Sequence, residues 1–258
     1  MVFPLRFGLL FAPLYAIIFK ILAAGSADCT EGEYRAVKRV KVSNNVIRRL
    51  PRYLRKLDEL SESGVDKISS RQLGEQLGLT SSQVRQDFNC FGEFGQQGYG
   101  YNVSALRAQI AGILGMDRGF SAILIGVGNI GRALMENFCF ADWGVHLAAA
   151  FDIKPALIGT EYKGVRIYDV AELEAYLRAH HVDIAVLTVP KTAAIAVTET
   201  LTGNGIDAIW NFTNVELTAP NSRTIVENVH FSDSLLSLSY YVAERRDETA
   251  AKAAREEK

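Results

Sequence analysis

One glycine-rich turn restricts the fold of this chain more than any other feature of its sequence. The apolar run over residues 121–126 has the composition of a strand buried on both faces. It leads directly into Gly-Val-Gly-Asn-Ile-Gly and an apolar helix over 132–138. In such a turn the first glycine allows the tight bend, the second lets a pyrophosphate approach the backbone, and the third lets helix and strand pack closely. The free N–H groups of the helix N-terminus favour phosphates. The sequence therefore predicts a dinucleotide-binding turn formed by Gly126, Val127, Gly128, Asn129, Ile130 and Gly131.

A carboxylate stands where such a turn requires one. The next apolar strand, over 145–151, ends in Asp152, about 20 residues after the glycine turn. A carboxylate there accepts both ribose hydroxyls and repels a 2′-phosphate, which favours NAD(H) over NADP(H). Lys154 weakens that preference slightly. A similar domain that binds no nucleotide remains the alternative.

Strand and helix patterns continue to alternate through the middle of the chain. Strands are expected over 165–168, 182–189 and 206–212, and helices over 170–180 and 192–201. This alternation predicts an α/β fold with a doubly wound parallel sheet. Ligands bind at the carboxyl ends of such strands. The residues expected near the cofactor there are Thr188, Val189, Pro190, Asn211 and Thr213.

The segment before the sheet predicts short capped helices. Ser69 and Gln72 have the spacing of a capping box, and Thr80 and Gln83 repeat it after the turn at Gly78. Two short helices joined by a turn that contains glycine are typical of a helix-turn-helix, although a plain helical hairpin has the same pattern. The outward positions of the second helix carry side chains that can contact bases and phosphates: Ser82, Gln83, Arg85, Gln86 and Asn89.

Charge and glycine patterns support a nucleic-acid surface near these helices. The whole chain has a formal net charge of −1, but residues 35–92 contain 12 Lys and Arg against 6 Asp and Glu. This excess is consistent with a surface that faces phosphates, and also with a solvated helix face. Residues 91–101 combine glycines and aromatics, which predicts a tight hairpin, or wing. Gln96 and Gln97 at its tip are expected to enter a minor groove, unless the hairpin is an ordinary surface loop.

The first 40 residues do not fit the rest of the chain. An apolar run over 7–19 lies between Arg6 and Lys20 and resembles a secretory signal, but it is short for a membrane span. We expect an over-extended start, with the protein beginning near residues 37–42, and keep a membrane anchor as the alternative. The three cysteines are widely separated and form no metal-binding spacing, which favours a reducing, cytoplasmic location without disulfides or metal.

The C-terminal part leaves little room for an enzyme. A dehydrogenase needs a substrate domain and an acid or base beside the nicotinamide. After Thr213 the chain has one expected strand and one helix, and among its four histidines only His230 follows that strand. We therefore expect a protein that is not an enzyme, with a small NAD-dependent oxidoreductase or a CoA- or nucleotide-binding module as alternatives. The last helix has an apolar face that packs on a partner subunit or on its own domain.

Taken in order, these motifs resemble the Rex family of redox-sensing transcriptional repressors over roughly residues 42–245. The resemblance rests on Ile68-Ser-Ser-Arg-Gln-Leu, Val84-Arg-Gln-Asp-Phe, the stretch over 91–103, Ile125-Gly-Val-Gly-Asn-Ile-Gly, Phe151-Asp and Leu187-Thr-Val-Pro. It implies a homodimer with swapped C-terminal helices that binds a palindromic operator with NAD+ and releases it with NADH. The domains it implies are an extension over 1–40, a winged helix-turn-helix over 41–118, a Rossmann domain over 119–228 and a swapped helix with its tail over 229–258.

The resemblance also implies roles for single residues. Arg49 and Arg55 correspond to positions that face DNA or the domain interface, and His230 and Phe231 to the pair that enters the partner's nicotinamide pocket. The chain departs from many members, which have Asp at His230, Tyr at Asn137, and Lys or Arg at Gln86 and Gln97. The first two positions help couple the cofactor to the DNA-binding domain, so these variants indicate a branch of the family with altered switching details.

Overall fold

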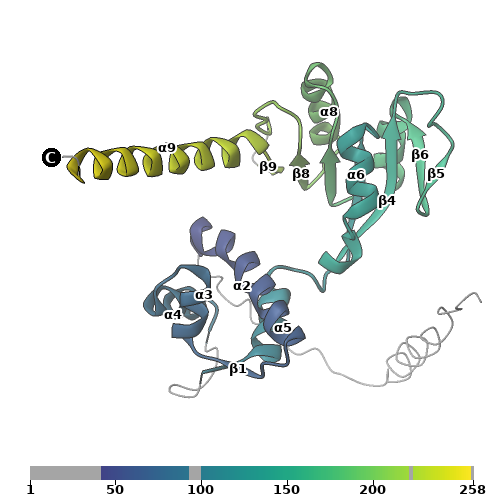
Figure 1. Ribbon diagram of the computed structural model, residues 1–258. Coiled ribbons are helices and arrows are strands. Elements are labelled where there is room, and N and C mark those ends of the chain that lie inside the picture. Colours follow the sequence, from purple (N-terminus) through teal and green to yellow (C-terminus); the bar gives the residue numbers. More distant parts are fainter. Residues whose placement is uncertain (1–41, 93–99, 221–222, 257–258) are drawn as a thin grey trace, which may run out of the picture. The chain divides into compact units, whose positions relative to one another are not determined.

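The computed structural model describes residues 42–92, 100–220 and 223–256 (Figure 1). The expected extension over 1–40, and Gln96 and Gln97 of the expected wing, lie outside these ranges. The described chain forms a small helical region, a seven-stranded sheet with helices, and a long C-terminal helix. No helix within these ranges is both long enough and apolar enough to cross a membrane.

The helical region buries one apolar cluster between its four helices. These helices are α2 (Asn44–Glu62), α3 (Ser70–Leu77), α4 (Ser81–Asn89) and α5 (Val103–Ile113). Leucines spaced along one face of α2 pack with residues such as Phe88 of α4 and Ile110 of α5. A two-residue antiparallel pair joins β1 (Lys67–Ile68) to β2 (Tyr101–Asn102). Because β1 precedes α3 and β2 follows α4, this pairing holds together the start and the end of the segment that contains both helices.

The predicted caps are present in part. Ser69 caps α3 with a complete capping box to Gln72, as predicted. Gly78 ends α3 in the left-handed conformation, with φ of 68°. Thr80 accepts a hydrogen bond from the main-chain N–H of Gln83 at the start of α4. The second half of that capping box, predicted from sequence spacing, is absent because the Gln83 side chain instead donates to Asp87.

The sheet has the order β5-β6-β4-β3-β7-β8-β9, and every neighbouring pair except β5–β6 is parallel. Its strands are β3 (Phe120–Ile125), β4 (Val145–Asp152), β5 (Glu161–Tyr162), β6 (Val165–Asp169), β7 (Ile184–Leu187), β8 (Ala208–Asn211) and β9 (Ile225–Asn228). The chain runs outward from β3 through β4 and β6, then returns to β7 on the other side. The strand order therefore reverses between β3 and β7, where ligands bind in open α/β sheets.

Both faces of the sheet are covered, which explains its continuous apolar strands. Ile123 and Ile125 of β3 belong to one core cluster, whereas Leu124 belongs to another. The first cluster also contains residues of α7 (Leu173–Ala179) and α8 (Lys191–Gly203), and the second contains Met135 of α6 (Asn129–Asn137). Two 3-10 turns, Phe140–Trp143 and Val170–Glu172, complete this part. The doubly wound parallel arrangement predicted from sequence is thus present.

The observed elements differ in detail from the predicted ranges. The strand expected over 182–189 is shorter, Ile184–Leu187, so Thr188 to Pro190 form the loop at its carboxyl end. The last element is the helix α9 (Phe231–Glu256). Its large apolar side chains remain between 44% and 68% exposed, and they are Leu235, Leu236, Leu238, Tyr240, Tyr241 and Val242. The structure therefore does not show α9 packed by these side chains against its own domain, which was one of the two expectations.

Candidate dinucleotide-binding and DNA-binding sites

The glycine turn between β3 and α6 is packed against the protein at its first and third glycines and has open space beside its second. Gly126 has φ of +96°, and a Cβ there would lie 2.8 Å from the carbonyl oxygen of Thr188. A Cβ at Gly131 would lie only 2.1 Å from the carbonyl oxygen of Gly126. By contrast, a Cβ at Gly128 would have no heavy atom within 4 Å. The outer glycines are thus required by the fold, whereas the middle one leaves space at the helix N-terminus that a phosphate can occupy.

Thr188 fixes this turn from the neighbouring strand. Its hydroxyl donates to the carbonyl oxygens of Gly126 at 2.6 Å and of Ile125 at 3.1 Å. Its main-chain N–H also donates to the Ile125 carbonyl oxygen at 2.9 Å. Val189 and Pro190 follow directly, and Pro190 precedes the first residue of α8. The structure therefore brings three of the predicted strand-end residues beside the glycine turn.

Asp152 joins the end of β4 to the same turn. Its side chain is 7% exposed, and one carboxylate oxygen accepts a hydrogen bond from the Val127 N–H at 2.7 Å. The other oxygen accepts one from the Lys154 N–H at 2.8 Å. A carboxylate oxygen has two acceptor positions, so each still has one for a ribose hydroxyl. The sequence indicated the ribose role but gave no sign that this carboxylate also orders the glycine turn.

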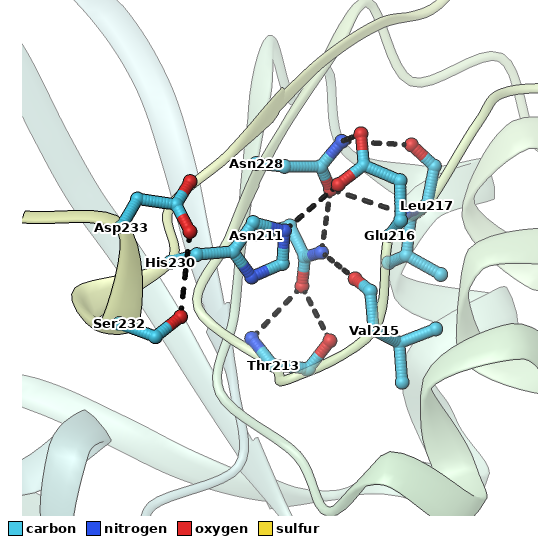
Figure 2. Close-up of polar contacts among 9 residues, drawn as sticks. All are labelled: Asn211, Thr213, Val215, Glu216, Leu217, Asn228, His230, Ser232 and Asp233. Atoms are coloured by element: carbon cyan, nitrogen blue, oxygen red, sulfur yellow. Dashed lines mark hydrogen bonds and ion pairs between the residues drawn. The ribbon is translucent and has the colours of Figure 1, made fainter. Parts of the chain in front are cut away.

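The side chain of Asn211 forms hydrogen bonds within its own domain. It is fully buried, and its amide nitrogen donates to the Val215 carbonyl at 2.8 Å and to the side-chain oxygen of Asn228 at 2.7 Å. Its amide oxygen accepts from both the N–H and the hydroxyl of Thr213. Figure 2 shows Asn211 at the centre of these bonds. Both amide hydrogens of Asn211 and the hydroxyl hydrogen of Thr213 are therefore already donated within the domain, and the expectation that these two residues lie near the cofactor stays a prediction.

A polar chain extends from Asn211 toward α9. Asn228 donates to one oxygen of Glu216 at 3.1 Å, and the other Glu216 oxygen lies 2.8 Å from Nε2 of His230 (Figure 2). His230 immediately precedes α9, and the ring of Phe231 lies 6.3 Å from that of Phe212. Sequence reasoning missed Glu216 and Asn228, because neither belongs to a recognisable motif. The exposed Asn137, at the end of α6, donates to its own helix.

In the helical region, a buried carboxylate accepts four hydrogen bonds. Asp87 of α4 is 0% exposed. Arg49 of α2 donates to both of its oxygens, at 2.6 and 2.7 Å, and the Tyr53 hydroxyl donates at 2.8 Å. The Gln83 amide nitrogen completes the set at 2.8 Å. Burial alone would raise the pKa of Asp87, but the hydrogen bonds from Arg49, Gln83 and Tyr53 outweigh it and hold that pKa below its usual value. The same burial and the neighbouring carboxylate raise the pKa of Tyr53.

Through this network Arg49, one of the predicted DNA-contacting residues, connects α2 to α4, because its guanidinium donates to both oxygens of Asp87. The other predicted DNA-contacting residues of the described chain are exposed or half-buried: Arg55, Ser82, Gln83, Arg85 and Gln86. Arg85 donates to the hydroxyls of Ser70 at 3.2 Å and Ser82 at 3.3 Å. It therefore lies between the N-termini of α3 and α4, where both helix dipoles favour an anion.

Comparisons with known proteins agree with this division of the chain. A family model described as "Putative DNA-binding protein N-terminus" matches residues 41–89, and one described as "CoA binding domain" matches residues 117–215. The redox-sensing transcriptional repressor Rex of Clostridium beijerinckii is 49% identical over 207 residues, which is 80% of this chain and 98% of that protein. Rex of Clostridium tetani is 46% identical over 210 residues, 81% of this chain and 99% of that protein.

Solved structures give the same result. The crystal structure of RSP in complex with β-NAD+ and operator DNA is 44% identical, has a TM-score of 0.75, and covers 83% of this chain and 98% of that one. RSP in complex with β-NADH is 42% identical, with a TM-score of 0.76 and coverage of 82% and 99%. These relatives are named as repressors and not as enzymes. With nearly the full length of each relative matched at this identity, the chain belongs to the Rex family of redox-sensing transcriptional repressors.

Proposed function

We propose that this protein is a redox-sensing repressor that binds operator DNA through its helical region and releases it when NADH replaces NAD+. The observation that carries the proposal is that one chain combines the capped α3–α4 helix pair with an open glycine turn beside Asp152. The relative RSP forms complexes with NAD+ and operator DNA and with NADH, which supports a role for both sites.

The cofactor is assigned to the turn by its chemistry. The pyrophosphate lies over the open side of Gly128, at the N-terminus of α6, and the adenosine ribose lies on the free acceptor positions of Asp152. The matched "CoA binding domain" model leaves CoA as a competitor. CoA carries a phosphate on its adenosine ribose, and a carboxylate at that place repels it, so NAD(H) is favoured. Val189, Pro190 and Phe231 are proposed to surround the nicotinamide.

DNA binding is assigned to the exposed side of α4. We place Ser82, Gln83, Arg85 and Gln86 at the major groove, with Arg55 of α2 at the backbone or at the domain interface. Gln96 and Gln97, which lie outside the described residues, are proposed to contact the minor groove. In this proposal residues 41–118 form the winged helix-turn-helix domain and residues 119–228 the cofactor domain.

The exposed apolar face of α9 supports a homodimer. Leu235, Leu238 and Val242 lie on one side of this helix, since they are three and four residues apart, and each is at least 44% exposed. Contiguous exposed apolar surface of this kind marks a protein interface. We propose that residues 229–258 exchange between two copies, which bind the two halves of a palindromic operator.

The switch needs only a difference in affinity. NAD+ carries a positive charge on a planar ring, whereas the reduced ring is neutral and puckered. If the two forms prefer different dimer shapes, the dimer shape that binds DNA is populated with one form and depleted with the other. Linkage then requires that DNA weaken NADH binding by the same factor by which NADH weakens DNA binding.

Fluorescence anisotropy at one fixed salt concentration tests the proposal, because salt alone changes affinity for DNA strongly. The full chain is titrated onto a labelled duplex from the region upstream of its own gene, with NAD+ or NADH. We expect tight binding with NAD+ that NADH abolishes. The matched control is Gly128→Ala, whose added Cβ meets no protein atom but occupies the phosphate space. It should bind DNA and ignore NADH. Absence of specific DNA binding by the wild-type chain would overturn the proposal.

A further inference from the structure

The four hydrogen bonds to Asp87 fill all of its acceptor positions. Each oxygen accepts two: Oδ2 from Arg49 and Tyr53, and Oδ1 from Arg49 and Gln83. An ionised carboxylate only accepts hydrogen bonds, so the side of the Gln83 amide that faces Asp87 must be the NH₂ group. The orientation of this amide, which is often ambiguous for glutamine, is therefore fixed here by chemistry.

In this orientation the Gln83 amide keeps one N–H donor and its oxygen acceptor available for another partner. One N–H of its amide is donated to Asp87, and within residues 42–92 and 100–220 no partner is found for the second N–H or for Oε1. Gln83 is half-buried and stands between the exposed Ser82 and Gln86 along α4. An amide that offers one donor and one acceptor matches the major-groove edge of adenine, which presents N7 as acceptor and the 6-amino group as donor.

We infer that Asp87 is a positioning residue for DNA readout, which holds the Gln83 amide in the orientation that recognises adenine and excludes the flipped one. This inference rests on the proposed DNA-binding function. Arg49 and Tyr53 of α2 hold the carboxylate in place, because they supply three of its four hydrogen bonds. The contact between α2 and α4 thus contributes to sequence preference as well as to packing.

The variant Asp87→Asn should reverse the direction of the hydrogen bond between residue 87 and Gln83. Arg49 donates only, so the side-chain oxygen of the new asparagine turns to Arg49 and its NH₂ group turns to Gln83. Gln83 must then present its oxygen to position 87, and the donor–acceptor pair left for DNA is lost. The matched control is Asp58→Asn, because Asp58 of α2 also pairs with an arginine, but that arginine is Arg107 of α5 and does not belong to the network of Asp87 and Gln83.

The test is selection from a random duplex DNA library with the full-length wild type, Gln83→Ala, Asp87→Asn and Asp58→Asn, with circular dichroism to verify folding. We expect the wild type to select a motif with one adenine per half-site whose preference falls about tenfold in Gln83→Ala. Asp87→Asn should lose preference at that position alone, and Asp58→Asn should select the wild-type motif. An unchanged motif with Gln83→Ala or Asp87→Asn, or an equal loss at all positions, would overturn the inference.

A second variant keeps the test decisive if Asp87→Asn does not fold. Arg49→Lys retains the charge but cannot hold both carboxylate oxygens, so Asp87 and Gln83 become less ordered. It should relax the same base position to a smaller extent, and a wild-type motif from Arg49→Lys would contradict the inference. If the wild type itself selects no motif, the DNA-binding function fails first, and that result differs from a failure confined to the variants.

Discussion

The main-chain N–H of Val127 donates a hydrogen bond of 2.7 Å to the carboxylate of Asp152, which connects the glycine turn to the end of the neighbouring strand. One side chain thus has two tasks in the proposed site, since it orders the turn and accepts the ribose hydroxyls.

Replacing Asp152 by asparagine should reduce both affinity for NADH and the preference for NADH over NADPH. An amide retains one acceptor oxygen, so one of the two main-chain N–H groups loses its partner, and repulsion of a 2′-phosphate disappears. Isothermal titration with both nucleotides measures the ratio of affinities, which should fall by about tenfold, the equivalent of 1.4 kcal/mol. Asp169→Asn, at the end of β6, is the control and should leave the ratio unchanged. An unaltered ratio in the Asp152 variant would refute the ribose assignment.

Two glycines of the same turn should respond differently to alanine. Gly128→Ala adds a Cβ in open space, so the melting temperature should change little while NADH binding is lost. Gly131→Ala places a Cβ 2.1 Å from the Gly126 carbonyl oxygen and 2.9 Å from the Thr188 hydroxyl, so it should lower the melting temperature. Thermal unfolding and NADH titration of both variants check this. If both variants had the same melting temperature and the same affinity for NADH, Gly128 and Gly131 would not have the different roles assigned to them here.

Asp87 should make the helical region sensitive to acid. Its pKa is lowered in the folded protein, so its ionised form stabilises the fold above the unfolded pKa of about 3.9. That contribution is lost as the pH falls below about 4 and through the native pKa. Asp87→Asn should therefore be less stable than the wild type at pH 7, by about 3 kcal/mol for a broken buried pair. Urea unfolding between pH 7 and pH 3 should show the difference narrowing at the acid end, and a constant difference would argue against the assignment.

A charge on the apolar face of α9 should dissociate the proposed dimer. Leu238 is 59% exposed in the single chain, and Leu238→Glu would bury a carboxylate in the subunit contact. Sedimentation velocity should report a dimer for the wild type and a monomer for this variant. Ser237→Glu is the control, because adjacent residues of a helix point in directions about 100° apart. A wild-type protein that sediments as a monomer would exclude the exchanged helix.

Local sequence patterns predicted the parts of this structure that depend on near neighbours. The capping box at Ser69, the glycine turn and the strand that ends at Asp152 each involve residues close in sequence, and each is present. Residues Arg49 and Asp87 are 38 positions apart, so no periodicity indicated that this arginine turns inward. Asn211 was assigned by its strand-end position alone, which says nothing of how many hydrogen bonds its amide already makes.

The observed and the proposed task of Asp152 together limit how cofactor preference can change over evolutionary time. In the proposed site, acceptance of a 2′-phosphate requires removal of this carboxylate, yet even its replacement by an amide leaves one of the N–H groups of Val127 and Lys154 without an acceptor. A single substitution would therefore trade selectivity against order in the turn. A descendant that responds to the NADPH pool would need at least one further change that supplies a new acceptor, so the response to NADH is protected by the fold itself.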